Sequence, residues 1–309
     1  MTVLVVGNCT VDLSFAVPRF PQAGETVLAQ EKHVDLGGKG ANQALVAHRF
    51  GAAVRLAAPI GTDADGDWAV ARLAATGLDT GAILRCAAPT DQSILYVTPD
   101  GENMIVSSHA AAASATPAWA EAAVTGLQAD AAAATLLVQG NLPEETTRAA
   151  LAAARGLGMR TMLNPAPIQY GYDRLFPLAD IAIVNAVEAR TLGRRDDPVE
   201  GARAIRDGGV PVVIVTLGSR GALVLDGDGE RAFPAPKVTA VDTVGAGDTF
   251  CGALVACLDR GIAMASAVAV AVQAAALTVT RKGTQSSFPD AGEAAALIAR
   301  HAETSGDLR

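Results

Sequence analysis

Short apolar segments alternate along this chain with longer stretches in which apolar residues recur every three or four positions. The short segments are rich in Val, Leu and Ile, which is typical of buried strands, whereas the longer spacing is typical of amphipathic helices. The predicted strands cover residues 3–6, 54–58, 135–139, 160–163, 181–184 and 212–216. The predicted helices cover residues 41–50, 65–75, 117–126, 144–155, 199–207, 246–259 and 263–279, with a last one near 291–301. This alternation predicts an α/β fold with a mainly parallel sheet and helices on both of its faces.

Two regions follow a different pattern, in which apolar and polar residues alternate as in half-exposed strands. They are residues 12–34 and 91–108, and the second contains segments 91–98 and 103–107 on either side of a turn at 99–102. The Asp-Gly pair in that turn favours a hairpin. The pattern leaves two arrangements open, a small separate sheet or an edge of the main sheet.

The composition is that of a chain able to bury a large aliphatic core. Of its 309 residues 50% are hydrophobic and 4% aromatic, and no change in composition divides it, which predicts a single domain over residues 1–309. The net charge of −8 and the pI near 5.0, without Lys/Arg clusters in the sequence, argue against a nucleic-acid partner. Residues 1–7 lack the basic start of a signal peptide, and the apolar stretch 263–279 is too short to span a bilayer. We therefore expect a cytoplasmic protein with no membrane partner.

The most informative motif is the octapeptide from Thr243 to Phe250, directly before a predicted helix. Gly245 and Gly247 let backbone amides approach a ligand, and the following helix adds the positive end of its dipole. Asp248 stands beside these amides and can take the proton of an attacking hydroxyl while the amides hold the charge of a migrating phosphoryl group. The alternative is an ordinary capped helix start. The combination favours phosphoryl transfer.

A second glycine cluster, residues 37–44, also precedes a predicted helix and includes Asn42, which can both donate and accept hydrogen bonds. Residues 8–12 add polar groups directly after the first predicted strand, at the carboxyl end where open α/β sheets bind ligands. Together the three segments indicate a hydroxyl-rich substrate. Two Asp/Gly runs, 63–67 and 226–230, lack the spacing of a calcium loop and are interpreted as polar turns.

In these motifs the chain resembles the ribokinase-like (PfkB) carbohydrate kinases over almost its whole length, most closely those of the ribokinase type. The matching segments are 37–42, 164–167, Asn185 with Glu188, 216–221, 242–250 and 279–283. The resemblance implies a three-layer α/β/α fold in which residues 12–34 and 91–108 form a small β-sheet lid that also joins two subunits into a homodimer. It further implies ATP-dependent phosphorylation of a primary hydroxyl of a small sugar, with Mg²⁺ and K⁺ as cofactors.

The resemblance also implies roles for residues of this sequence. Asp248 would be the general base, and the amides of Gly245, Ala246 and Gly247 would form an anion hole. The implied sugar contacts are Thr10, Asp12, Gly38, Lys39, Asn42, Asn141 and Asp248. The implied nucleotide contacts are Asn185, Thr216, Gly218, Ser219, Gly221 and Gly247, with Glu188 holding Mg²⁺ through water. A K⁺ site would use the Asp242 carboxylate, main-chain oxygens of Val244, Thr278, Arg281 and Gly283, and Ser287.

Several of these roles have plainer alternatives. Lys39 could be a solvated lysine, Glu188 a first-turn helix carboxylate stabilised by the helix dipole, and Asp242 a residue that begins a helix. Near the adenine, Val272 or Gln273 takes the place of a histidine of the family. The alternatives for the whole chain are a nucleoside kinase of the same fold and a sugar-binding regulator that has lost catalysis.

Two sugar positions depart from the ribokinase pattern. Where that pattern has Asn-x-Asp after the first strand, this chain has Thr10 and Asp12, and Asn141 replaces a sugar-contacting glutamate. Both changes alter the hydrogen bonds that the site can offer. A sugar whose buried hydroxyl is left without a partner has a much lower kcat/KM. We therefore expect that D-ribose is not the best substrate.

Overall fold

An eight-stranded central sheet forms the core of the computed structural model, which describes residues 2–100, 102–127 and 133–304. The strands lie in the order β14-β13-β12-β11-β10-β9-β1-β4. Neighbours from β12 to β4 are parallel, whereas the β12–β13 and β13–β14 pairs at one edge are antiparallel. The bounds are β1 Thr2–Val6, β4 Ala53–Ala57, β9 Thr135–Gln139, β10 Arg160–Asn164, β11 Ile181–Asn185, β12 Val212–Thr216, β13 Ala222–Asp226 and β14 Gly229–Phe233.

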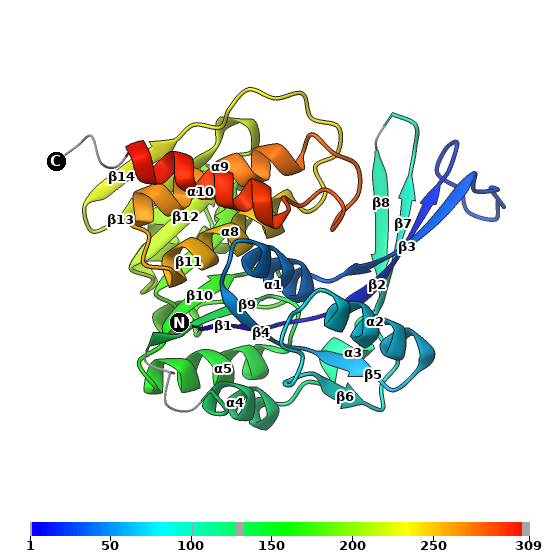
Figure 1. The fold of residues 1–309 in the computed structure, drawn as a ribbon, viewed down its shortest axis with the longest axis horizontal. Helices are drawn as coiled ribbons and strands as arrows, with labels where there is room; N and C mark the ends of the chain where they lie inside the picture. Colours follow the sequence, from blue (N-terminus) through cyan, green and yellow to red (C-terminus); the bar gives the residue numbers. More distant parts are fainter. Residues whose placement is uncertain (1, 101, 128–132, 305–309) are drawn as a thin grey trace.

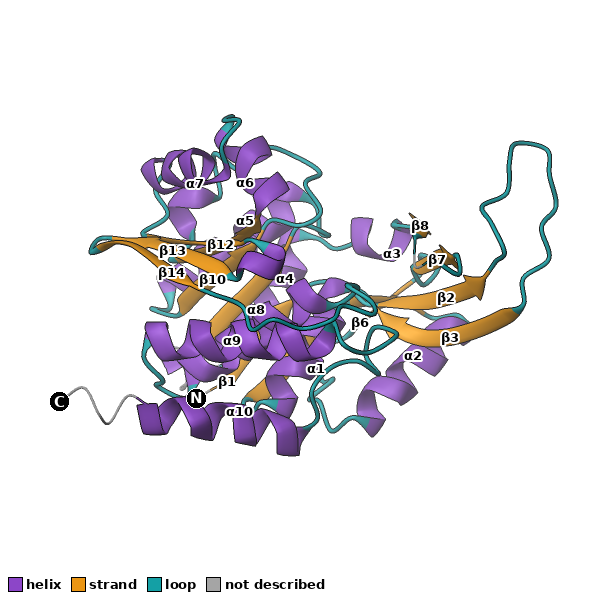
Figure 2. Cartoon of the chain, turned by 90° about the horizontal axis from the view of Figure 1, so that it is seen from above, coloured by secondary structure: helices purple, strands orange, loops and turns teal. Residues whose placement is uncertain are grey.

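Helices cover both faces of this sheet. Because side chains alternate along a strand, Val3 and Val5 join one apolar cluster with α1, α8, α9 and α10, whereas Leu4 and Val6 join another with α4 to α7. Figure 2 shows α8, α9 and α10 on one side of the sheet and α6 and α7 on the other, which confirms the three-layer α/β/α fold. The bounds are α1 Lys39–Arg49, α2 Ala64–Ala75, α3 Ala110–Ala113, α4 Pro117–Thr125, α5 Glu144–Gly156, α6 Ala186–Gly193, α7 Pro198–Asp207, α8 Ala246–Asp259, α9 Met264–Thr278 and α10 Ala291–Thr304.

A separate four-stranded sheet protrudes from the main body, at the right of Figure 1. Its strands lie in the order β3-β2-β7-β8, with β2 and β7 parallel and the outer pairs antiparallel. The bounds are β2 Thr10–Ala16, β3 Glu31–Gly37, β7 Gln92–Val97 and β8 Asn103–Ser107, and a two-stranded sheet of β5 Pro59–Gly61 and β6 Leu84–Cys86 completes the fold. Of the two arrangements left open by the sequence, the separate sheet is therefore the correct one.

Most predicted elements are present, with differences that have local causes. The predicted strand region 12–34 is too long and starts too late, since β2 begins at Thr10 and residues 17–30 form a loop before β3. The run 63–67 is not a polar turn, because Asp63 caps α2 by accepting the Gly66 N–H at 2.9 Å. The run 226–230 does form the turn between β13 and β14, although the sequence analysis did not predict these two strands.

Some predictions involve residues that lie outside the described part of the chain. Gly101 of the expected Asp-Gly turn is one of these, as are residue 1 and residues 305–309 of the expected 1–309 domain. On either side of residue 101, β7 and β8 pair in an antiparallel ladder from Ser93–Ser107 to Val97–Asn103. This ladder confirms the hairpin.

Candidate functional site

The glycine-rich loop before α1 lies directly on the backbone that leaves β1. A Cβ atom at Gly38 would lie 2.8 Å from Cys9 Cα, and one at Gly40 would lie 2.6 Å from the Asn8 nitrogen. Gly38 also has a φ of 87°, a left-handed conformation that favours glycine. The cluster is therefore needed for close packing, which brings the first turn of α1 to the carboxyl end of the central sheet.

Asp248 is buried in the first turn of α8 and faces the first turn of α1. Its Oδ1 accepts hydrogen bonds from Gln43 Nε2 at 3.0 Å and from Lys39 Nζ at 3.4 Å. Its Oδ2 accepts a hydrogen bond from Asn42 Nδ2 at 3.1 Å. The negative charge of Asp248 raises the pKa of Lys39, whose side chain is 36% exposed. Three residues of one helical turn thus hold a carboxylate that is 6% exposed.

Gly245 begins α8 in a left-handed conformation, with φ of 80°. A Cβ atom there would lie 2.6 Å from the Phe288 ring, whereas a Cβ atom at Gly247 would meet nothing within 4 Å. The first N–H groups of a helix lack partners within the helix and carry its positive dipole end. The open space at Gly247 therefore gives an anion access to the amides of this turn.

Asp12 is mostly buried on β2, beside the same turn of α1. Its Oδ1 accepts a hydrogen bond from Thr10 Oγ1 at 2.7 Å, and a Cβ atom at Gly37 would lie 2.1 Å from its carboxylate oxygens. Burial raises the pKa of Asp12 to about 6, and the charges of Asp35 and Asp248 also raise it. The structure thus brings Thr10, Asp12, Asn42 and Asp248 to one polar region, and their contact with a sugar stays a prediction.

A chain of buried amides continues from Asp248 across the sheet. Gln43 Nε2 also donates to Asn164 Oδ1 at 3.1 Å, and Gln43 Oε1 accepts from Gln139 Nε2 at 2.9 Å. Asn164 Nδ2 in turn donates to the Ile183 carbonyl oxygen at 2.9 Å. The sequence analysis gave none of these amides a role. The available signal was Gln43 itself, a polar residue within the apolar run of a buried helix.

Asn141 follows β9 at the same edge of the sheet. Its Oδ1 is buried and has no hydrogen-bond partner within residues 2–100, 102–127 and 133–304, and its carbonyl oxygen lies 2.7 Å from His109 Nε2. In the described part of the chain, the Asn141 side chain forms no hydrogen bond with Thr10 or Asp248. Its predicted place near the sugar stays a prediction.

A cleft of about 420 Å³ lies next to the N-terminal turn of α8, and Ala246, Gly247 and Phe250 line it. Four of the predicted nucleotide contacts that line it are Thr216, Gly218, Ser219 and Gly221, and Gly247 lines it as well. Most of its remaining surface is apolar, with Lys237 as an added cation; the apolar side chains include Val238, Phe250, Val272, Ala275, Ala276 and Val279. Such a cleft suits a flat apolar ring with phosphates at its polar end. Of the two residues predicted beside the adenine, Val272 lines the cleft.

Gln273, the other of those two residues, has its Nε2 2.8 Å from His301 Nε2. It is absent from the described lining of the cleft, because its neighbour Val272 takes the inward position on α9. Of these two residues, the apolar one therefore faces the cleft.

Asn185 and Glu188 form a capping box at the start of α6. Asn185 Oδ1 accepts the N–H of Glu188 at 2.9 Å, and Glu188 Oε2 accepts the N–H of Asn185 at 2.8 Å. Burial raises the pKa of Glu188, and the nearby positive charge of Lys39 partly opposes this shift. The pair therefore has a structural role, and it fixes the Glu188 carboxylate within electrostatic range of Lys39 and Asp248. Asn185 is not among the described residues that line the cleft.

Asp242 joins two loops next to α8. Its Oδ1 accepts the N–H of Val244 at 3.0 Å, and its Oδ2 accepts the N–H of Gly283 at 3.1 Å. The N–H groups of Val241 and Asp242 both lie near the Val279 carbonyl oxygen, at 2.7 and 3.2 Å. The predicted K⁺ ligands on residues 242–244 and 278–283 are therefore neighbours. Arg281 pairs its guanidinium with Glu293, so only its main-chain oxygen is available to an ion.

Within the described residues, no group of three or more His, Cys, Asp or Glu side chains could hold a metal ion. Asp242 carries a single negative charge, and both of its carboxylate oxygens accept main-chain N–H groups. The K⁺ site expected around Asp242 stays a prediction. In the same part of the chain, no helix is both long enough and apolar enough to cross a bilayer.

Comparison with known proteins gives one consistent result. The family model of the pfkB family carbohydrate kinases matches residues 2–291. Ribokinase of Haemophilus influenzae is 35% identical over 295 residues, which cover 93% of this chain and 95% of the relative. Ribokinase of Thermotoga maritima has a similar structure, with a TM-score of 0.85, 31% identity and coverage of 96% and 99%. The structure of ribokinase from Cryptococcus neoformans var. grubii in complex with ADP matches with a TM-score of 0.78 and 28% identity, over 96% of this chain and 99% of the relative.

Proposed function

The chain belongs to the pfkB family of carbohydrate kinases, and we propose that it transfers the γ-phosphoryl group of ATP to a primary hydroxyl of a small sugar. The observation that carries this proposal is the position of Asp248. It lies between the polar region with Asp12 and Asn42 and the apolar cleft that Gly247 lines. A sugar hydroxyl on one side and a phosphoryl group on the other would meet at this residue.

Asp248 acts in this proposal as the general base. Its carboxylate takes the proton of the sugar hydroxyl as the oxygen attacks phosphorus, the new P–O bond forms, and the bond to the ADP oxygen breaks. The amides of Gly245, Ala246 and Gly247 stabilise the charge on the migrating group, because they lie at the positive end of the α8 dipole. Lys39 supplies a cation on the same side.

The sugar is held by Thr10, Asp12, Gly38, Lys39, Asn42 and Asn141, and the nucleotide by Asn185, Thr216, Gly218, Ser219, Gly221 and Gly247. The apolar lining of the cleft and the ADP-bound relative from Cryptococcus neoformans support the nucleotide assignment. Because Asn185 is held by Glu188 and lies outside that lining, its contact would be with the phosphate end of the nucleotide.

Two ions complete the proposal. Glu188 would hold hydrated Mg²⁺, since its carboxylate is fixed by Asn185 and keeps lone pairs that can accept from bound water. The Mg²⁺ supplies positive charge at the phosphates. K⁺ would be held by the Asp242 carboxylate, main-chain oxygens of Val244, Thr278, Arg281 and Gly283, and Ser287. It would stiffen the loop that leads into α8.

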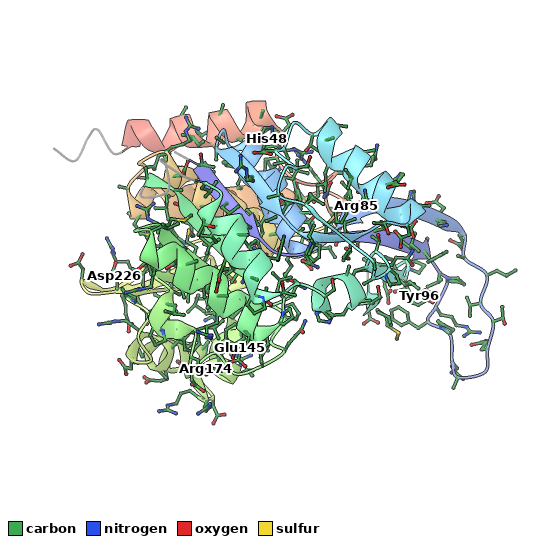
Figure 3. The ribbon with its side chains drawn as sticks, turned by 90° about the horizontal axis from the view of Figure 1, so that it is seen from below. His48, Arg85, Tyr96, Glu145, Arg174 and Asp226 are labelled. Atoms are coloured by element: carbon green, nitrogen blue, oxygen red, sulfur yellow. The ribbon has the colours of Figure 1, made fainter. Side chains whose placement is uncertain are left out.

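We also propose that the small sheet is a lid of a single kinase domain and the dimer contact. Thr10 and Asp12 begin the sheet, which ties it to the sugar region. The opposite face of the sheet is mostly apolar, and we call it the outer lid face; by the strand register it contains Leu13, Phe15, Val34, Ile94, Tyr96, Met104 and Val106, with Lys32 opposite Phe15. At the base of this face, Leu13 packs against the core of the main body. Figure 3 places Tyr96 on this protruding part. A second copy of this chain would cover the outer lid face.

The experiment that tests the function is an ADP-release assay over pentoses, hexoses, ketoses, nucleosides and deoxysugars. We expect sugar-dependent ADP release by the wild type and a kcat lower by at least about 100-fold for Asp248→Asn, the effect of losing a general base. ADP affinity should stay unchanged in that variant. The proposal fails if no sugar stimulates ADP release or if Asp248→Asn turns over at the wild-type rate. A preference for nucleosides would support the nucleoside kinase alternative.

A further inference from the structure

We infer that Gln43 is a positioning residue for the reaction: its side-chain amide fixes Oδ1 of Asp248 and leaves Oδ2 to take the proton of the sugar hydroxyl. This inference rests on the proposed role of Asp248 as the general base. It adds a named oxygen atom and a residue that holds the carboxylate without contacting either substrate.

The two carboxylate oxygens of Asp248 have different surroundings. Oδ1 accepts from Gln43 Nε2 at 3.0 Å and from Lys39 Nζ at 3.4 Å, so both of its lone-pair sites are in use. Among the described residues, only Asn42 Nδ2 donates a hydrogen bond to Oδ2, at 3.1 Å. One lone-pair site of Oδ2 is therefore open. A base needs such a site to receive a proton, and Oδ2 provides it.

The amide of Gln43 has only one orientation that its neighbours allow. Its two N–H groups point to Asp248 Oδ1 and Asn164 Oδ1, and its oxygen accepts from Gln139 Nε2. If the amide were turned over, its oxygen would face two acceptor oxygens, Asp248 Oδ1 and Asn164 Oδ1. Gln139 does not set this direction, since its own Oε1 has no partner among the described residues. Gln43 is 0% exposed, so water cannot relieve such a mismatch. The network therefore requires that Gln43 donates to Asp248.

This network connects the carboxylate to the central sheet rather than to α1 alone. Gln139 ends β9, Asn164 ends β10, and Asn164 Nδ2 donates to Ile183 on β11. Lys39 cannot orient the carboxylate in this way, because its side chain is 36% exposed and its single contact is long, at 3.4 Å. Small errors in the placement of a reacting group cost large factors in rate. A donor held by three strands is suited to prevent such errors.

The experiment compares Gln43→Met and Gln43→Glu with the wild type. Methionine has a similar length but no N–H group, so we expect kcat to fall by roughly 10- to 100-fold, the cost of a small misplacement of reacting groups. The KM for sugar and the affinity for ADP should change by less than about threefold, because Gln43 contacts neither substrate in the proposed arrangement.

Gln43→Glu tests the pH dependence of kcat, which would not change if Gln43 had a purely structural role. It places a second carboxylate against Asp248, and neighbouring like charges resist ionisation. The acid limb of the kcat profile should therefore move to higher pH by about one unit or more. Other charged or titratable groups near Asp248 are the same in both enzymes; they are Lys39 on α1, Asp12 on β2, Glu188 on α6 and Cys251 on α8.

Two further variants separate positioning from folding. Thr146→Val removes a buried hydroxyl that donates to the Ala115 carbonyl oxygen at 2.7 Å and has no contact with Asp248, so its kcat and pH profile should match the wild type. Gln139→Met keeps the Gln43–Asp248 hydrogen bond but removes a support of Gln43, and should lower kcat by roughly 3- to 10-fold. Gln139→Met also tests the inference if the Gln43 variants do not fold.

The inference is overturned if Gln43→Met or Gln139→Met keeps kcat within about twofold of the wild type, or if the acid limb of Gln43→Glu does not move. It is also overturned if kcat and ADP affinity fall together, since that would show general loss of structure. A fully active Asp248→Asn would instead reject the proposed base, and with it the function on which the inference rests.

Discussion

At the residue scale, the Asp12 carboxylate lies where burial disfavours its charged form. Asp12 is mostly buried, and burial raises its pKa from 3.8 to about 6. Its hydrogen bonds with Thr10 and Ser93 offset part of this desolvation. A raised pKa means that the folded protein binds a proton more tightly than the unfolded chain does. The free energy of unfolding therefore falls as the pH rises from about 4 to about 6.

Asp12→Asn should for this reason stabilise the ligand-free protein. Above pH 6 we expect a gain of roughly 1–3 kcal/mol in the free energy of unfolding, since one pKa unit corresponds to about 1.4 kcal/mol. The gain should shrink toward pH 4, while the KM for sugar rises at least about tenfold through the lost acceptor. Urea unfolding at several pH values measures the first effect. A variant less stable than the wild type above pH 6 would contradict it.

The second residue-scale prediction concerns sugar preference. The Thr10 hydroxyl donates its only hydrogen to Asp12, and the side-chain oxygen of Asn141 is buried with no partner among the described residues. Both therefore offer hydrogen bonds unlike those of the ribokinase pattern. A buried hydroxyl left unpaired costs roughly 1–3 kcal/mol, enough for a tenfold change in preference. We expect that kcat/KM for D-ribose is lower than for another pentose, a ketohexose or a related polyol sugar. The double variant Thr10→Asn, Asn141→Glu should shift the preference toward ribose.

The measurement is kcat/KM over the sugar panel for both proteins. If the wild type already prefers ribose by more than about tenfold and the double variant gains nothing, these two positions do not set specificity.

At the scale of elements, the site depends on how closely α1 packs against α8. Gly252 lies one turn after Asp248 on α8, and a Cβ atom there would lie 2.6 Å from Val46 Cβ and 2.7 Å from the Gln43 carbonyl oxygen. Any larger residue at 252 must push the two helices apart. The donors to Asp248 all come from the facing turn of α1, so their distances depend on this contact.

Gly252→Ala should therefore impair both stability and catalysis, although Gly252 touches no substrate in the proposed arrangement. We expect a loss of about 1–3 kcal/mol in the free energy of unfolding, typical of overpacking, and a kcat lower by roughly tenfold. Gly156→Ala on α5 is the matched control, because a Cβ atom there meets nothing within 4 Å. Equal effects of the two substitutions on kcat would show that the α1–α8 distance is unimportant.

The loop before α8 provides another element-scale prediction. Asp242 holds Val244 and Gly283 together, and the proposed K⁺ would bind the same segments. Replacing tetramethylammonium by K⁺ at constant ionic strength should raise the wild-type rate by roughly fivefold or more, the lower range of typical coupling between sites. Asp242→Ala should abolish this response with a smaller effect on the KM for sugar. Equal wild-type rates in the two salts would count against the site.

At the scale of the whole molecule, the outer lid face exposes several large apolar side chains away from the main body. Val34, Met104 and Val106 are 43%, 46% and 61% exposed on it, and Phe15 and Tyr96 have ring centroids 6.2 Å apart beside them. Contiguous exposed apolar surface of this kind marks association sites. Because the sheet begins at Thr10 and Asp12, association there would also steady one side of the sugar region.

We expect a dimer in analytical ultracentrifugation, and Val106→Asp should weaken it by at least about tenfold, because a charge would be buried without a partner. Its KM for sugar should rise as well, since the lid loses support. Leu157→Asp makes the same chemical change at a position 37% exposed and distant in sequence from the lid, and should leave the dimer intact. A monomeric wild type at micromolar concentration would contradict the prediction.

The sequence by itself determined the α/β class, most strands and helices, and the family, because periodicity and glycine placement are local properties of the chain. It also singled out Asp248, since a small-residue loop followed by a helix start is a local pattern as well. Elements in which polar and apolar residues are mixed were harder to identify from local patterns. The β13–β14 hairpin at the sheet edge and the Asp63 cap of α2 are the clearest cases.

Only the tertiary structure decided which atoms meet. Gln43 and Asp248 are 205 positions apart, and Gln43 and Gln139 are 96 positions apart, so no local pattern could pair them. The direction of the Gln43 amide depends on its partners on α8, β9 and β10. The same holds for Val272 and Gln273: both lie on one helix, and packing alone turns Val272 into the cleft. Burial, which sets the pKa of Asp12, likewise exists only once the chain has folded around it.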